Sequence, residues 1–233
     1  MTGYYEPEIN VSFKRTEKFS VPILKYNKVY DNLDREKIES NFKIQDVLLW
    51  TDSKIELFFL QIQGSGIGSL GKKKKIKINY DGNNKKKYLS IGKFLKRKKL
   101  INGEINLFTI KRFLYKNPNL VDEVLNQNKR YIFFSIDKKN FKESSIGSMG
   151  LNLIPFVSVA IDKKYYPLGM PLILEKITNN KLIPVVSMDT GAAIVGKNRA
   201  DLFTGRGVEA EKIAGELKKK LFIYVLVPKD YDG

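Results

Sequence analysis

Residues 189–207 read DTGAAIVGKNRADLFTGRG, a stretch punctuated by glycines, with one aspartate at its start and another at position 201. Its four glycines indicate tight turns or close backbone approaches that a side chain would block. Loops of this kind often hold functional groups on a rigid scaffold. From spacing alone two interpretations stay open: Asp189 and Asp201 are functional carboxylates, or they are turn residues, because Asp-Thr-Gly is a common turn tripeptide.

The segments on either side of this stretch predict a small barrel. Short strand patterns follow one another at 155–161, 172–174 and 183–188, and short strands at close intervals favour a barrel over a sandwich of long sheets. Apolar spacing predicts an amphipathic helix at 209–220 and then a final buried strand at 222–227. Ahead of the barrel pattern, the polar segment at 137–150 is the best linker candidate.

The first half of the chain predicts a β-rich unit followed by helices. Residues 1–50 are irregular except for an amphipathic stretch at 34–42. After this stretch we expect a buried strand at 56–63, which ends in a glycine loop at 64–68, and a strand at 75–80 with a turn at 81–83. Helical patterns follow at 91–100 and 107–126, and Asn117-Pro118 breaks the second of them. A short aromatic strand is expected at 131–135.

The composition excludes several kinds of chemistry. The chain has 233 residues, no cysteine and no histidine, so it has no disulfide, thiolate metal site, cysteine nucleophile or histidine-dependent catalytic triad. Acid/base work would fall to carboxylates, lysine or tyrosine, and we expect no metal and no organic cofactor. No apolar run approaches the roughly 18 residues of a membrane span, and Met1 to Pro7 lack the pattern of a signal peptide. We therefore expect no export address in this chain.

The net charge of +17 raises nucleic acid as a partner. Only 7 of the 42 basic residues are arginine, and the lysines accompany abundant Asn, Ile, Tyr and Phe, a mixture typical of an AT-rich genome. We interpret the lysine clusters at 72–75, 85–87 and 96–99 as solvated faces and turns, and we expect no nucleic-acid partner. A basic surface would also attract an anionic polymer that carries carboxylates.

Three motifs resemble the three-aspartate domain of the membrane-bound lytic murein transglycosylase A family: the stretch 189–207, Ser158 to Asp162, and Pro167-Leu168-Gly169. Further fragments are similar to the same family in the same order: Thr2 to Pro7, Phe59 to Gly66, Ser90-Ile91-Gly92 and Asn128 to Phe134. The resemblance therefore covers nearly the whole chain. It argues against an aspartic protease, which also carries Asp-Thr-Gly.

The resemblance implies a mainly β fold with a few helices: a double-psi β-barrel that carries the three aspartates, with a second β-rich domain inserted into it and a substrate groove between the two. We expect the barrel, as catalytic domain, to comprise residues 1–18 and 136–233. The inserted substrate-groove domain would comprise residues 19–135.

The resemblance also implies the reaction. The family cleaves the β-1,4 bond between N-acetylmuramic acid and N-acetylglucosamine in peptidoglycan without water, and forms 1,6-anhydromuramoyl products. Its catalytic acid/base corresponds to Asp201. A free aspartate has a pKa of about 3.9, so the site must raise that pKa by burial or by a neighbouring like charge. Asp189 and Asp162 are candidates for this neighbour, and an equally weighted alternative is that they accept backbone N–H bonds to fix loops.

The expected site residues follow from the motif match. The catalytic residues are Asp201 and Asp189. The substrate-binding residues, whose amide, hydroxyl and ring groups would contact the sugars, are Asp162, Thr2, Gly3, Tyr4, Gln61, Gln63, Gly64 and Ser65.

The chain departs from the family pattern at two places. Ala192 and Val195 replace residues of the usual Asp-Thr-Gly-Gly-Ala-Ile-Lys loop, which would matter at Ala192 only if that position needs a positive φ. Family members also carry an export signal, a lipid anchor and a segment ahead of Thr2-Gly3-Tyr4, and we expect these to be absent here.

The remaining expectations concern location and alternatives. Location in the periplasm or at the outer membrane is implied by the family, with peptidoglycan glycan strands as partner and a monomeric state. The main alternative is an inactive, truncated murein-binding protein, and a second is a basic nucleic-acid-binding module.

Overall fold

The computed structural model describes residues 1–71, 74–138, 144–176 and 181–229. The chain forms two compact units, which are described separately: unit 1 comprises Met1–Tyr5 and Glu143–Gly233, and unit 2 comprises Glu6–Lys142. The expected division into a catalytic barrel and a substrate-groove domain, at 18/19 and 135/136, stays a prediction. Residues 139–143 of the expected linker and 72–73 of the first lysine cluster lie outside the described residues.

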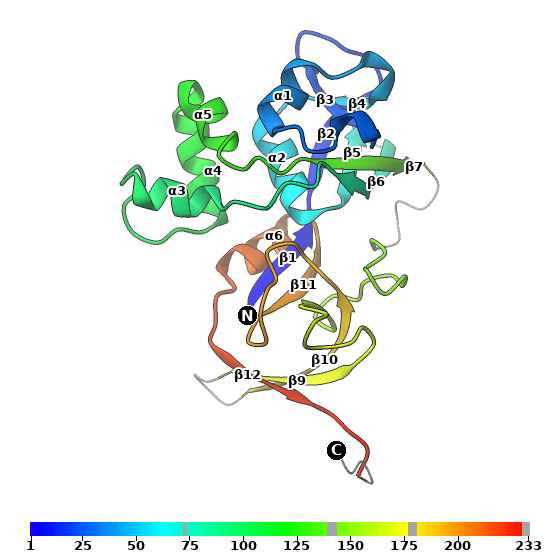
Figure 1. Cartoon of the computed structure of the whole chain (residues 1–233), viewed down its shortest axis with the longest axis vertical. Coiled ribbons are helices and arrows are strands. Elements are labelled where there is room, and N and C mark those ends of the chain that lie inside the picture. The colour runs from blue at the N-terminus through cyan, green and yellow to red at the C-terminus, as the bar shows by residue number, and fades with distance from the viewer. Residues whose placement is uncertain (72–73, 139–143, 177–180, 230–233) are drawn as a thin grey trace. The chain divides into compact units, whose positions relative to one another are not determined.

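Unit 1 is built on a six-stranded sheet that curls into a nearly closed barrel (Figure 1). The strand order is β1-β11-β8-β10-β9-β12. The strands are β1 (Thr2–Glu6), β8 (Ser158–Ile161), β9 (Pro171–Lys176), β10 (Leu182–Asp189), β11 (Ala200–Arg206) and β12 (Leu221–Val225). β8 pairs in parallel with β10 and antiparallel with β11. The short strands expected at 155–161, 172–174 and 183–188 are confirmed, and with them the mainly β class.

The core of unit 1 consists of apolar side chains that point into the barrel. They include Val159, Ile161, Leu172, Leu174, Val185, Ala200 and Leu202. Helix α6 (Gly207–Glu216) packs on β11, at the place where an amphipathic helix was expected. Gly3 on β1 allows the close approach of this helix, because a Cβ there would lie 2.7 Å from the Cα of Ala214.

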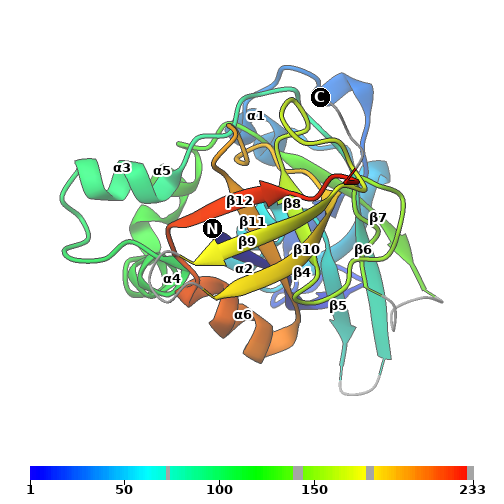
Figure 2. The same cartoon turned by 90° about the horizontal axis from the view of Figure 1, so that it is seen from below.

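The last strand of unit 1 differs from its prediction as a buried strand. Figure 2 shows β12 beside β9 at one end of the sheet. Successive side chains of a strand point to opposite faces: Leu221 and Ile223 pack against the core of unit 1, whereas Phe222 is 56% exposed and Tyr224 47% exposed. The apolar run at 222–227 thus predicted a strand correctly, but the prediction that this strand is buried is wrong.

Unit 2 contains a second six-stranded sheet, in the order β3-β4-β2-β5-β6-β7. Its strands are β2 (Glu8–Ser12), β3 (Val21–Leu24), β4 (Val47–Thr51), β5 (Gly66–Leu70), β6 (Lys74–Asn83) and β7 (Ile132–Asp137). Ile9, Ile23, Leu49, Ile78 and Phe134 from five of these strands share one apolar core. Short helices complete this part: η1 (Lys28–Tyr30), α1 (Arg35–Ser40) and η2 (Ile44–Asp46).

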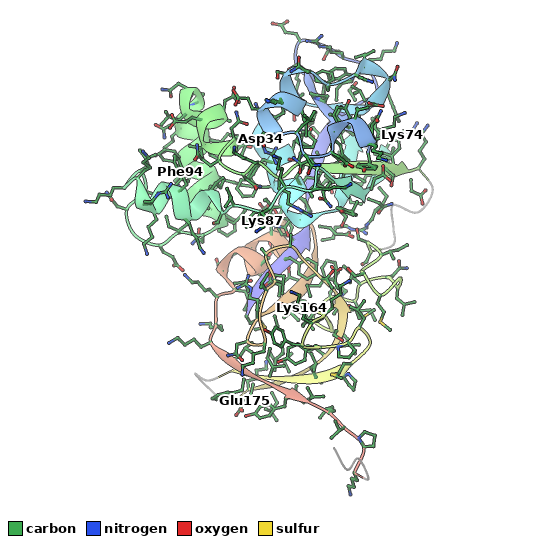
Figure 3. All side chains as sticks on the ribbon, viewed as in Figure 1. Asp34, Lys74, Lys87, Phe94, Lys164 and Glu175 are labelled. Carbon is green, nitrogen blue, oxygen red and sulfur yellow. The ribbon has the colours of Figure 1, made fainter. Side chains whose placement is uncertain are left out.

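A helical group covers another part of unit 2. It comprises α3 (Ile91–Arg97), α4 (Leu107–Lys116), η3 (Pro118–Leu120) and α5 (Val121–Leu125), as expected from the apolar spacing and the break at Asn117-Pro118. Asn106 caps α4 in a capping box with Thr109, which satisfies donors at the helix start. Figure 3 shows Phe94 among these helices, where it packs in their shared core.

Residues 56–63 form most of helix α2 (Lys54–Gln63) rather than the expected strand. Ser53 caps its start by accepting a hydrogen bond from the Glu56 N–H, and Gly64 ends it in the left-handed conformation with φ 88°. The turn expected at 81–83 is also wrong, since β6 continues to Asn83 through a register shift opposite β7. In the residues that the structure describes, none of the helices is both long enough and apolar enough to cross a bilayer.

Candidate active site

Asp201 lies on β11, in the part of unit 1 where three strands meet. It pairs with Ala160 on β8 in the antiparallel ladder, and β1 lies on the other side of β11. Sequence alone suggested a loop that runs to Gly207, whereas β11 already begins at Ala200. A carboxyl on a central strand is held more rigidly than one on a loop, and the Asp201 side chain is only 13% exposed.

The Asp201 carboxylate has two side-chain partners in unit 1. The hydroxyl of Thr2 donates a hydrogen bond to Oδ1 of Asp201. Nη2 of Arg199 lies 3.0 Å from the same oxygen and donates to the Thr2 hydroxyl at 2.9 Å. The three side chains thus form a closed triangle around one carboxylate oxygen.

Burial raises the pKa of Asp201, while the positive charge of Arg199 and the hydrogen bond from Thr2 act in the opposite direction. A carboxyl removed from water favours its neutral form. Of the two causes expected from the sequence, burial operates, and neither Asp162 nor Asp189 is among the groups that shift this pKa. Such a carboxyl can serve as a proton donor and, once ionised, as an acceptor.

Asp189, at the end of β10, organises its surroundings through three hydrogen bonds. It accepts from the Tyr4 hydroxyl at 3.1 Å, from the Ser148 N–H at 3.0 Å and from the Ser148 hydroxyl at 2.9 Å. The Ser148 and Thr190 hydroxyls are 2.7 Å apart. These contacts join β1, β10 and the loop around Ser148 within unit 1.

Asp162 follows β8 and holds the loop that contains Gly196. It accepts hydrogen bonds from the Gly196 N–H at 2.8 Å and the Lys164 N–H at 3.1 Å. These bonds lower the pKa of Asp162, the Gly196 bond most strongly. Ala192 lies outside the left-handed region, so the family's second glycine can be replaced there without backbone strain.

Two contacts in unit 1 bring expected site residues together. Thr2 contacts Asp201, and Tyr4 contacts Asp189 and packs against Phe203 with ring centroids 5.3 Å apart. Gly3 lies between them on β1, against α6. The first motif of the chain and the last therefore meet in one unit.

The expected site residues of unit 2 lie at the end of α2 and just beyond it. Gln61 is 4% exposed, and its amide donates to the Ile132 carbonyl at 3.1 Å. Gln63, Gly64 and Ser65 are partly exposed. The structure thus places Gln61 inside unit 2 and the other three at its surface.

Arg199 is the functional candidate that sequence reasoning did not single out. It lies two residues before Asp201 and directly before β11, which begins at Ala200. That spacing was the available signal. In the described part of the chain, no group of three or more acidic, His or Cys side chains could hold a metal ion.

The geometry can be compared with known proteins. Residues 1–135 match the family described as MltA specific insert domain, and residues 157–227 match the 3D domain. Membrane-bound lytic murein transglycosylase A of Vibrio cholerae is 31% identical over 232 residues, which cover 93% of this chain and 62% of the relative. The chain thus spans less than two thirds of the length of that relative.

Solved structures agree with these matches. A crystal structure of E. coli MltA with bound chitohexaose superposes with a TM-score of 0.88 at 27% identity, covering 96% of this chain and 70% of that one. A membrane-bound lytic murein transglycosylase from Agrobacterium tumefaciens gives 0.86 at 26% identity, covering 98% and 73%. The expected double-psi β-barrel with a second β-rich domain is confirmed. The chain belongs to the MltA family.

Proposed function

We propose that this protein is a lytic transglycosylase that cleaves the β-1,4 bond between N-acetylmuramic acid and N-acetylglucosamine in peptidoglycan. The observation that carries the proposal is the Asp201 carboxyl on β11, whose side chain is only 13% exposed and whose pKa is raised by burial. A general acid must hold its proton near the working pH, and burial is one way to achieve this. Membership of the MltA family and a relative with bound chitohexaose, a β-1,4 glycan, support the substrate class.

The proposed reaction needs one carboxyl. Protonated Asp201 gives its proton to the glycosidic oxygen, the bond from that oxygen to C1 of the muramoyl residue breaks, and the N-acetylglucosamine part leaves with a free hydroxyl. The C6 hydroxyl of the muramoyl residue then bonds to C1, and the Asp201 carboxylate takes its proton. No water is consumed, and Asp201 returns to its starting state. The intramolecular hydroxyl replaces the water or the second carboxylate of ordinary glycosidases.

The other site residues receive proposed roles in the same reaction. Asp189 contributes to catalysis by fixing Tyr4 and the Ser148 loop, which fits its three hydrogen bonds. In unit 1 the proposed substrate contacts are Thr2, Gly3, Tyr4 and Asp162. In unit 2 they are Gln63, Gly64 and Ser65, with Gln61 acting from inside as the support of the α2 end.

The domain roles and the location are part of the proposal. The barrel, residues 1–18 and 136–233, would act as the catalytic domain, and residues 19–135 would supply the substrate groove. The Vibrio cholerae relative is named membrane-bound, which supports action on peptidoglycan in the periplasm or at the outer membrane. We propose that the protein acts as a monomer.

The test is a digest of purified peptidoglycan sacculi with the protein, followed by mass spectrometry of the released fragments. We expect 1,6-anhydromuropeptides from the unaltered protein and none from Asp201→Asn. Asp122→Asn is the matched control, because the same atoms change on a carboxylate that is 71% exposed, and it should release the same products as the unaltered protein.

Two results would contradict the proposal. Fragments with ordinary reducing ends would show a hydrolase, because water has then been added. Binding to sacculi without any release, measured by pull-down, would show the inactive murein-binding protein instead.

A further inference from the structure

We propose that Arg199 is a positioning residue for Asp201: it binds one carboxylate oxygen directly and through Thr2, and so leaves the proton to the other oxygen. This inference rests on the proposed acid/base role of Asp201. It concerns a residue that acts through Asp201 and Thr2 and need not touch the glycan itself.

Two side-chain donors meet at Oδ1 of Asp201. Nη2 of Arg199 lies 3.0 Å from Oδ1 of Asp201 and 2.9 Å from Oγ1 of Thr2. A guanidinium can only donate hydrogen bonds, so the Thr2 oxygen accepts from Arg199 and its own proton is turned to Asp201. Two donors therefore converge on Oδ1, which makes Oδ1 the unfavourable oxygen for a proton and assigns the exchanged proton to Oδ2.

In the described part of the chain, the polar contacts of Arg199 are directed at two residues. Its Nε is buried and has no hydrogen-bond partner among the described residues. The hydrogen bond and the ion pair that its side chain makes there go to Thr2 and Asp201. A structural arginine usually satisfies several of its five donors, as Arg35 does with Glu39 and the carbonyls of Asn128 and Arg130. The arrangement of Arg199 indicates a role directed at Asp201.

Arg199 also acts on Asp201 through its charge. Against the effect of burial, the pKa of Asp201 is lowered by Arg199, by the hydroxyl and the backbone N–H of Thr2, and by the amino group of Met1. The facing strand β8 supplies the apolar Val159, Ala160 and Ile161. Burial alone raises the pKa of Asp201 and would leave it a weak acid. The positive charge of Arg199 acts in the opposite direction, because it favours the carboxylate that forms when the proton leaves. Arg199 is 35% exposed, so water screens part of this effect.

The experiment compares Arg199→Gln, Arg199→Lys and Lys197→Gln. Lys197→Gln is the matched control, because it removes one positive charge from an exposed residue of the same loop. The rate of anhydromuropeptide release is measured against pH, and the melting temperature of each variant is recorded. The pKa of the Asp201 carboxyl is measured by carbon-13 NMR, with its signal assigned by comparison with Asp201→Asn.

We expect Arg199→Gln to raise the pKa of Asp201, and with it the alkaline limb of the pH–rate profile, by about one pH unit. The maximal rate should fall about 10-fold, because a weaker acid protonates the leaving oxygen less readily. Arg199→Lys keeps the charge and should return the limb to within a few tenths of a unit of the unaltered protein. Lys197→Gln should leave both the alkaline limb of the profile and the maximal rate unchanged.

If Arg199 has a purely structural role, Arg199→Gln lowers the rate but leaves both the alkaline limb of the pH–rate profile and the pKa of Asp201 unchanged. That result would overturn the inference. The NMR titration also separates the two proposals. If the unaltered protein releases no anhydromuropeptides, the proposed function fails, while the Asp201 pKa in Arg199→Gln still decides the role of Arg199.

Discussion

Glu6 and Lys77 form an ion pair inside unit 2, with 2.6 Å between Oε1 and Nζ and exposures of only 2% and 4%. Removing one partner of such a pair leaves the other charge buried without its ion-pair partner. We predict that Lys77→Met lowers the free energy of unfolding by about 3–5 kcal/mol. Urea unfolding followed by the fluorescence of Trp50, which also lies in unit 2, measures this loss.

An exposed ion pair nearby is the control. Lys75 pairs with Glu8 at 2.7 Å, but the two side chains are 41% and 34% exposed. Lys75→Met should therefore cost no more than about 1 kcal/mol. Equal losses in the two variants would show that burial of the Glu6–Lys77 pair has no energetic consequence.

Gly3 allows α6 to approach β1, and alanine at this position should disrupt the packing. The added Cβ would lie 2.7 Å from the Cα of Ala214, which is backbone and cannot rotate away. We predict that Gly3→Ala destabilises unit 1 by about 1–3 kcal/mol, measured by thermal unfolding. Gly191→Ala should be milder, because its Cβ would meet only the side chain of Ile194. A milder effect at Gly3 than at Gly191 would contradict this account.

Asp189 and Ser148 should behave as one unit. Asp189→Ala leaves the Ser148 N–H and two hydroxyls without their acceptor, and we predict a loss of about 1–3 kcal/mol in stability. Release of anhydromuropeptides should fall as well, because Tyr4 loses its anchor. In a double-mutant cycle with Ser148→Ala, the two losses should be less than additive. Additive losses would mean that the two side chains act independently.

The raised pKa of Asp201 makes stability depend on pH. Because the folded-state pKa lies above the unfolded value of about 3.9, the folded protein holds the proton more tightly. Stability from this group therefore falls as pH rises from about 4 through the folded-state pKa. We predict that Asp201→Asn has a higher melting temperature than the unaltered protein at neutral pH, and that this difference vanishes below about pH 4.

The comparison needs a control for the loss of a carboxylate. Asp122→Asn, on an exposed side chain, should show no such pH-dependent difference. If Asp201→Asn melts below the unaltered protein at neutral pH, the buried carboxyl stabilises the fold as an anion, and its role as a protonated acid is contradicted.

The sequence predicted correctly those elements whose apolar residues recur at the spacing of a single type of secondary structure. The helices α3 and α4 have a polar face, and Asn117-Pro118 marks the break between α4 and α5. Residues 56–63 were misread because helix α2 buries Leu57, Phe58, Phe59 and Leu60 in succession. A continuous apolar run has no polar face to reveal its period, so it does not distinguish a buried helix from a buried strand.

The candidate site was predictable in part. The motif match identified Asp201 and the β1 residues, but the environment of Asp201 depends on which side chains reach it in space. Thr2 precedes Asp201 by 199 positions, and no local pattern joins the two. The hydrogen bonds of Asp189 to Ser148 were likewise invisible, because the loop around Ser148 has no period and no recognisable turn pair.

The pairing of β1 with β11 also sets the order of events during synthesis. The ribosome makes Asp201 199 residues after Thr2, which takes about 10–40 s at about 5–20 residues per second. Throughout that interval β1 has no neighbour on the side where β11 will lie, and all of unit 2 is made before β11. The acid therefore acquires its surroundings only near the end of translation, so a chain that stalls before β11 contains a finished unit 2 and no assembled acid/base site.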